Sequence, residues 1–134
     1  MPLTHEERQA IINYRLEKAD RAFVEAKDCA AMGHWSLASN RLYYAAYYAS
    51  SALLISGGYQ AKTHEGSISL IGQYYVQPGL LSKEEGALLA RLQNMRHTGD
   101  YDDFFDWTQE DVEPCFPKVE AFIKKLKDII PKSC

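Results

Sequence analysis

The sequence has few cysteines, no long apolar run and no excess of positive charge. Its three cysteines form no CxxC pair, so neither a zinc site nor a disulfide framework is indicated. No apolar run approaches the roughly 18 residues that a membrane span needs. Fifteen Lys and Arg against 18 Asp and Glu give a formal net charge of -3, whereas dedicated duplex binders carry a basic excess. We therefore expect no membrane partner and no duplex DNA partner.

Several other signals are also absent. The first residues, MPLTHEERQA, lack a signal-peptide pattern, so we expect a cytoplasmic protein. No Gly-rich phosphate loop, repeat or strand-like alternation occurs, and we expect no cofactor. The 134 residues, 46% of them hydrophobic, fit one globular domain over 1–134 with its core at about 5–130.

Apolar residues recur with helical spacing along most of the chain. We expect a first helix that Thr4 caps, with Glu7 in a capping box, and that Gly33 ends. A second helix over about 35–55 is apolar on most sides, which is typical of the centre of a bundle. A third is expected over about 63–76.

A fourth helix should begin after Ser82, with Glu85 in a second capping box, and Gly99 stands where a C-terminal breaker belongs. Thr108 opens the last helical segment. Pro114 predicts a kink or a second start there, because an interior proline costs about 3 kcal/mol. The sequence thus predicts an all-α fold, an antiparallel bundle of four to five helices.

The segment MRHTGDYDD, residues 95–103, has two interpretations. Arg96 could bind a phosphate through paired hydrogen bonds, and the imidazole of His97 could move a proton. Together they could support metal-free RNA cleavage, in which the 2′-hydroxyl attacks the adjacent phosphate. Alternatively, Arg96 and Asp100 have the spacing of a helix-surface ion pair, and Tyr101 packs.

The segment NRLYYAAYYA, residues 40–49, places four tyrosines on the expected central helix. Bases stack on such rings, but tyrosines at helical spacing are also typical of a core or a subunit interface. Arg41 lies on this mostly apolar helix and needs a partner. We expect an aspartate from 100–106.

Two further segments carry polar candidates. In KTHEG, residues 62–66, helix-start amides with Lys62 and His64 could hold a phosphate. Alternatively, Thr63 caps the helix and His64 lies in its solvated first turn. The acidic residues of 100–111 could bind a hard cation but lack EF-hand register, so we interpret them as a solvated loop and helix start, with no metal site.

In this order and at these separations, NRLYYAAYYASSALL, KTHEG and RHTGDYDD resemble the HEPN superfamily. They are most similar to its small stand-alone prokaryotic proteins, with R-x-Y-Y-A, K-T-H and R-x-x-x-D-Y motifs. The resemblance covers about residues 10–125. It implies a helical bundle that forms a homodimer and is often encoded beside a minimal nucleotidyltransferase as a toxin–antitoxin pair. It also implies, for active members, metal-independent ribonuclease activity.

In active members a histidine follows the arginine after four to six residues, and two such motifs face each other across the dimer cleft. Here Arg96 stands at the arginine position, but Tyr101, Asp102 and Asp103 stand at the histidine positions. His97 projects about 100° around the helix from Arg96. Catalysis is therefore expected to be weak or absent.

We thus expect a HEPN module that binds a nucleotide or RNA phosphate, or a partner nucleotidyltransferase. The alternatives are a metal-independent endoribonuclease toxin and a purely structural dimeric scaffold. Arg96 would bind phosphate, Asp100 would orient Arg96 or accept a proton, and Tyr44 and Tyr101 would line the cleft. The candidates for catalysis are Arg96, Asp100, Tyr101, His64 and His97. The candidates for ligand binding are Arg41, Tyr44, Lys62, His64 and Arg96.

Overall fold

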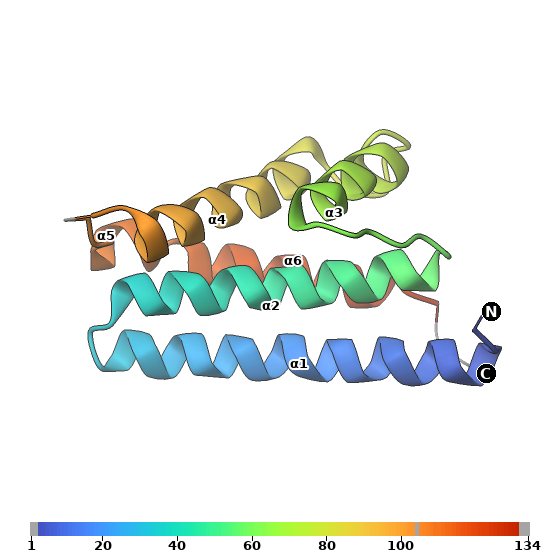
Figure 1. Ribbon diagram of the computed structural model, residues 1–134, viewed down its shortest axis with the longest axis horizontal. Coiled ribbons are helices and arrows are strands. Elements are labelled where there is room, and N and C mark those ends of the chain that lie inside the picture. Colours follow the sequence, from blue (N-terminus) through green and yellow to red (C-terminus); the bar gives the residue numbers. More distant parts are fainter. Residues whose placement is uncertain (1–2, 104, 132–134) are drawn as a thin grey trace.

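The computed structural model describes residues 3–103 and 105–131, which form helices joined by short loops (Figure 1). In chain order the elements are α1 (His5–Ala31), α2 (Trp35–Ser56), α3 (His64–Ile71), the π-helical η1 (Gly72–Val76), α4 (Lys83–Tyr101), α5 (Gln109–Val112) and α6 (Cys115–Ile129). No strand occurs in the two described ranges, and the predicted all-α fold is confirmed. None of these helices is long and apolar enough to cross a membrane.

Helix α2 forms the centre of the bundle. It lies antiparallel to α1, and it also contacts α4 and α6 on its other sides (Figure 1). Many of its buried residues are alanines, which let neighbouring helices approach closely. They are Ala38, Ala45, Ala46, Ala49 and Ala52. The central position predicted from a helix that is apolar on most sides is therefore confirmed.

The helix starts follow from local sequence. At the start of α1, Thr4 Oγ1 accepts from the Glu7 amide at 3.0 Å and Glu7 Oε1 accepts from the Thr4 amide at 2.9 Å. Ser82 and Glu85 form the same predicted capping box at the start of α4. Each bond pairs an amide that the first helical turn leaves without an acceptor.

The expected third helix is present, but its second half has a different winding. After α3 the chain continues into η1, where the Gln77 amide donates to the Gly72 carbonyl at 2.9 Å. This π-helical turn buries Tyr75, whose hydroxyl donates to the Leu53 carbonyl of α2 at 3.2 Å. The turn therefore helps to hold the α3 segment against the central helix.

The expected break in the last helical segment is confirmed. Helix α5 ends at Val112, and α6 begins at Cys115, directly after Pro114. Pro117 lies in the first turn of α6, where a backbone amide has no acceptor within the helix. The two prolines are therefore compatible with a restart of the helix, whereas one continuous helix would have to bend around them.

The prediction that Gly99 ends α4 is wrong, because α4 continues to Tyr101. Gly99 instead permits close packing: a Cβ there would lie 2.9 Å from Cδ1 of Trp107. The indole Nε1 donates to the Met95 carbonyl at 2.7 Å, and the Trp107 amide donates to Ser36 Oγ at 2.8 Å. The glycine thus allows the segment after α4 to fold back against α4 and α2.

Candidate functional site

Arg96 of α4, His64 of α3 and two tyrosines of α2 meet on one side of the bundle. Cζ of Arg96 lies 5.3 Å from the ring centroid of Tyr43 and 5.8 Å from that of Tyr44. The His64 ring centroid lies 5.6 Å and 6.1 Å from the same two rings. Three helices thus bring a guanidinium and an imidazole to one pair of tyrosines. We call these four residues the Arg96 cluster.

The guanidinium of Arg96 is nearly buried and has unused hydrogen-bonding capacity. Its side chain is 13% exposed, and Nη1 lies 3.9 Å from Asp100 Oδ2, which is the predicted ion pair but too long for a hydrogen bond. No described residue accepts a hydrogen bond from its buried Nε. A desolvated charge needs partners, and the rings of Tyr43 and Tyr44 supply cation–π attraction alone. A ligand with several anionic oxygens would supply the acceptors.

Asp100 is itself held in place by α2. Asn40 Nδ2 donates to Asp100 Oδ2 at 2.9 Å, so the same oxygen faces both Asn40 and Arg96. Asn40 is not among the site residues predicted from the sequence. The helical spacing could have predicted it, because Asn40 lies one helical turn before Tyr43 and Tyr44 and therefore shares their side of α2.

His64 stacks on the tyrosines of α2. Thr63 Oγ1 accepts from the Gly66 amide at 2.9 Å, as the capping alternative predicted. However, His64 does not lie in a solvated turn. Its ring centroid is 4.4 Å from that of Tyr47, and its Nδ1 is hydrogen-bonded to the Tyr43 hydroxyl. The residue is part-buried because α3 lies against this side of α2.

The protonation states of His64 and Tyr43 follow from their burial. Burial, and then the positive charge of Arg96, lower the pKa of His64, so its imidazole is neutral at pH 7. Burial raises the pKa of Tyr43 far above its usual value, so the phenol keeps its proton. The Tyr43 hydroxyl therefore donates to Nδ1, and the remaining imidazole proton lies on Nε2. His64 thus presents a hydrogen-bond donor in the Arg96 cluster.

Arg41 does not have the partner that we expected. Its Cζ lies 5.1 Å from the ring centroid of Tyr44, but its Nη1 pairs with Glu25 of α1 at 3.1 Å. The expectation of an aspartate from 100–106 is therefore wrong. The reason is tertiary: the side of α2 that carries Arg41 faces α1, whereas Asn40 faces the end of α4.

The other predicted residues lie outside the Arg96 cluster. Tyr101 is 64% exposed at the end of α4, and its ring centroid lies 5.0 Å from that of His97, which is also exposed. Lys62 is exposed in the loop before α3. None of the described contacts joins these three residues to Arg96. The structure thus brings Asp100 and Arg41 to the cluster, but not Tyr101, His97 or Lys62.

Two acidic residues after α4 accept hydrogen bonds, one from α2 and one at the start of α5. Asp106 accepts a hydrogen bond from Ser36 Oγ, and Asp111 accepts from the Thr108 amide at 3.2 Å and hydroxyl at 2.8 Å at the start of α5. Across residues 3–103 and 105–131, no three His, Cys, Asp or Glu side chains are arranged to hold a metal ion.

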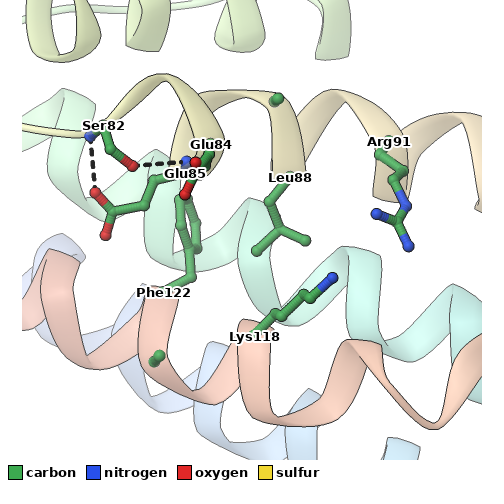
Figure 2. Close-up of a pocket in the computed structure, with 9 residues that line it drawn as sticks. Ser82, Glu84, Glu85, Leu88, Arg91, Lys118 and Phe122 are labelled. Carbon is green, nitrogen blue, oxygen red and sulfur yellow. Dashed lines mark hydrogen bonds between the residues drawn. The ribbon is translucent and has the colours of Figure 1, made fainter.

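A groove of about 440 Å³ lies between α4 and α6 (Figure 2). Leu88 and Phe122 line it, and the side chains of Arg91 and Lys118 lie toward one end (Figure 2). Arg91 and Arg96 are five residues apart, so they project about 140° from each other around α4. The groove contains none of the predicted site residues. Arg91 is therefore a suitable control for the role of Arg96.

The fold and the cluster define an all-α protein with a nearly buried arginine close to the end of a bundle helix. The sequence matches the HEPN domain over residues 12–129, and the chain belongs to this family. A UPF0332 protein of Thermotoga maritima is 31% identical over 124 residues, covering 92% of this chain and 94% of the relative. A UPF0332 protein of Archaeoglobus fulgidus is 28% identical, with 91% and 97% covered. A Methanocaldococcus jannaschii protein named "Putative toxin MJ0605" is 30% identical, with 65% and 64% covered.

Proposed function

We propose that this chain is a toxin-like HEPN module that binds a nucleotide or RNA phosphate through Arg96. The observation that supports this proposal is an Arg96 side chain that is 13% exposed, lies near two tyrosine rings, and has a buried Nε for which no described residue supplies an acceptor. A phosphate would accept two of its N–H groups and neutralise its charge. The name of the M. jannaschii relative, "Putative toxin MJ0605", supports the toxin-like character.

The neighbouring residues have distinct roles in this proposal. Asp100, fixed by Asn40, orients the guanidinium of Arg96. His64 donates from Nε2 to a second phosphate oxygen. Tyr44, which is half-buried, offers a ring to the base or ribose.

The proposal includes two protein partners, both supported by the resemblance to HEPN proteins. One is a second copy of the chain, in a homodimer whose two Arg96 clusters face each other. The other is a minimal nucleotidyltransferase encoded by a neighbouring gene, acting in the cytoplasm as the antitoxin. Because no histidine follows Arg96 at the usual spacing, the proposed module is catalytically weak or inactive.

A second candidate, a metal-independent endoribonuclease, is favoured by the position of His64. This residue supplies an imidazole to the Arg96 cluster from another helix. In the reaction a bond forms between phosphorus and the 2′-oxygen, whose proton passes to solvent, and the bond to the 5′-oxygen breaks. The minor, protonated form of His64 would give its Nε2 proton to the leaving oxygen and return to the neutral form, and Arg96 would stabilise the phosphorane charge. A positioned acid–base group contributes roughly 10²–10⁴-fold.

Binding of uridine 5′-monophosphate, measured by calorimetry, tests the main proposal. Arg96→Ala should weaken binding roughly ten- to hundredfold, because it removes charge-assisted hydrogen bonds. Arg91→Ala is the matched control from the same helix and should leave the affinity unchanged. Equal affinities in all three proteins would contradict the proposal. If Arg96→Ala lowered stability alone, the purely structural scaffold would be favoured.

A metal-free incubation with mixed-sequence RNA distinguishes the two candidates. Cleavage to 2′,3′-cyclic ends by wild type and Arg91→Ala, but not by Arg96→Ala or His64→Gln, would establish the endoribonuclease. Binding that depends on Arg96 without any cleavage would establish the binding module. Growth arrest on expression, relieved by Arg96→Ala, would show that the same residue is needed for toxicity.

A further inference from the structure

A second group of aromatic and basic side chains lies on the face formed by α1 and α2. The two helices are antiparallel, and three contacts fix their register. Arg15 Nη1 donates to Ser51 Oγ at 2.7 Å, Lys18 Nζ lies 4.5 Å from the ring centroid of Tyr48, and the Glu25–Arg41 ion pair lies further along. Side chains of α1 are thereby placed beside the tyrosines of α2.

These side chains continue from the Arg96 cluster toward α1. The ring centroids of Tyr44 and Tyr48 are 5.8 Å apart, and Tyr44 also belongs to the Arg96 cluster. Beyond Tyr48, Lys18 Nζ lies 5.5 Å from the ring centroid of Tyr14. We call Tyr44, Tyr48, Lys18 and Tyr14 the tyrosine strip. Neighbouring members of the strip are 4.5–5.8 Å apart. Each of these distances exceeds the roughly 3.4 Å step between stacked bases of one strand, so the strip is long enough for more than one nucleotide.

The strip is accessible and its charge is positive. Tyr14 is 55% exposed, and the side chains of Lys18, Tyr44 and Tyr48 are half-buried. None of the ion pairs within the described ranges involves Lys18. Asp20, a nearby carboxylate of α1, is turned away and pairs with Lys127 of α6 at 2.8 Å. Exposed rings next to a free ammonium are suited to a chain that alternates flat bases with phosphates.

We propose that the tyrosine strip binds single-stranded RNA, as an extension of the phosphate site at Arg96. This inference rests on the proposed function. One phosphate lies at Arg96, a phosphate further along the same strand lies at Lys18, and bases stack on Tyr48 and Tyr14. A duplex does not fit this chemistry, because its bases are already stacked on each other and do not present free faces. The strip therefore selects a single strand over both a duplex and a mononucleotide.

The experiment compares a short 2′-O-methyl oligouridylate with uridine 5′-monophosphate. The 2′-O-methyl group blocks attack by the 2′-oxygen, so binding is measured without cleavage. Tyr14→Ala should weaken oligonucleotide binding roughly five- to hundredfold, as expected for loss of one stacked base, and Tyr14→Phe should retain binding. Lys18→Ala should lower the magnitude of the slope of log affinity against log salt by about 0.7. Neither change should alter binding of the mononucleotide.

Matched controls come from other parts of the surface. Tyr74→Ala removes a partly exposed tyrosine of η1, and Lys125→Ala removes an exposed lysine of α6. Both should bind the oligonucleotide like wild type. The same strand annealed to oligoadenylate should bind more weakly than the single strand. Circular dichroism of each variant confirms that it is folded, which is expected because the side chain of Tyr14 is mostly exposed.

The outcomes separate the two proposals. If Arg96→Ala does not weaken mononucleotide binding, the proposed function fails, whereas the Tyr14 and Lys18 variants still report on the strip. The strip is refuted if the oligonucleotide binds no more tightly than the mononucleotide, or if Tyr14→Ala and Lys18→Ala bind it like wild type. Equal binding of duplex and single strand would also refute it. A change of oligomeric mass in these variants, measured by light scattering, would instead assign this face to an interface between copies and overturn the inference.

Discussion

Replacing Gly99 by alanine sets local helix propensity against tertiary packing. In a helix interior alanine is about 1 kcal/mol more favourable than glycine, so the sequence around this position favours the substitution. The structure opposes it, because the new Cβ would lie 2.9 Å from Cδ1 and 3.1 Å from Nε1 of Trp107. The indole is not free to retreat, since its Nε1 is bonded to the Met95 carbonyl and its backbone amide to Ser36.

The expected change in the free energy of unfolding is the balance of overpacking, a lost hydrogen bond and a gain in helix propensity. Overpacking of a close contact costs about 1–3 kcal/mol. Displacement of the indole would also remove a hydrogen bond that contributes about 0.5–1.5 kcal/mol. The gain in helix propensity offsets about 1 kcal/mol of this loss. We therefore expect Gly99→Ala to lower the free energy of unfolding by about 0.5–3.5 kcal/mol.

Urea unfolding followed by far-UV circular dichroism measures this change. With a denaturant slope of about 2 kcal/mol per molar, a loss of 2 kcal/mol lowers the midpoint by about 1 M. Gly72→Ala is the matched control, because Gly72 is helical and no atom lies within 4 Å of its added Cβ. It should raise stability by about 0.4–1 kcal/mol. A Gly99→Ala variant at least as stable as wild type would refute the proposed packing against Trp107.

Three further predictions concern packing, titration and charge. Ala46→Leu should lower stability by about 1–3 kcal/mol, because Ala46 is 0% exposed between close helices; an unchanged urea midpoint would show that α2 is not tightly packed there. The folded-state pKa of His64 lies below the ordinary value of 6.5, so the unfolded chain binds more protons and wild type should lose stability as pH falls below about 6.5 toward the folded-state value. His64→Gln should lack this part of the loss, and identical pH profiles of the two proteins would contradict the argument. Arg41→Ala should cost less than about 1 kcal/mol, because the side chains of its ion pair with Glu25 are 27% and 48% exposed; a loss above about 3 kcal/mol would mean that the charge is effectively buried.

The sequence by itself determined the helices and much of the list of candidate residues. Some features depend only on residues within one helical turn of each other, namely the caps at Thr4 and Ser82 and the restart at Pro114. Both members of each such interaction are close together in the sequence, so the sequence is sufficient to predict it. The amphipathic spacing similarly determined the all-α class and the central place of α2. Arg96 was also evident, as a charged residue at the end of an apolar helical pattern.

The tertiary structure alone decided which of these residues meet. His64 lies beside Arg96 because α3 and α4 lie against the same side of α2, and Arg41 pairs with Glu25 because its side of α2 faces α1. Trp107 returns to pack on Gly99, within α4, in the space that a side chain would fill. Each of these contacts joins different segments of the chain. Helical periodicity states which residues share one face of a helix, but the neighbour of that face is set by how all the helices pack together.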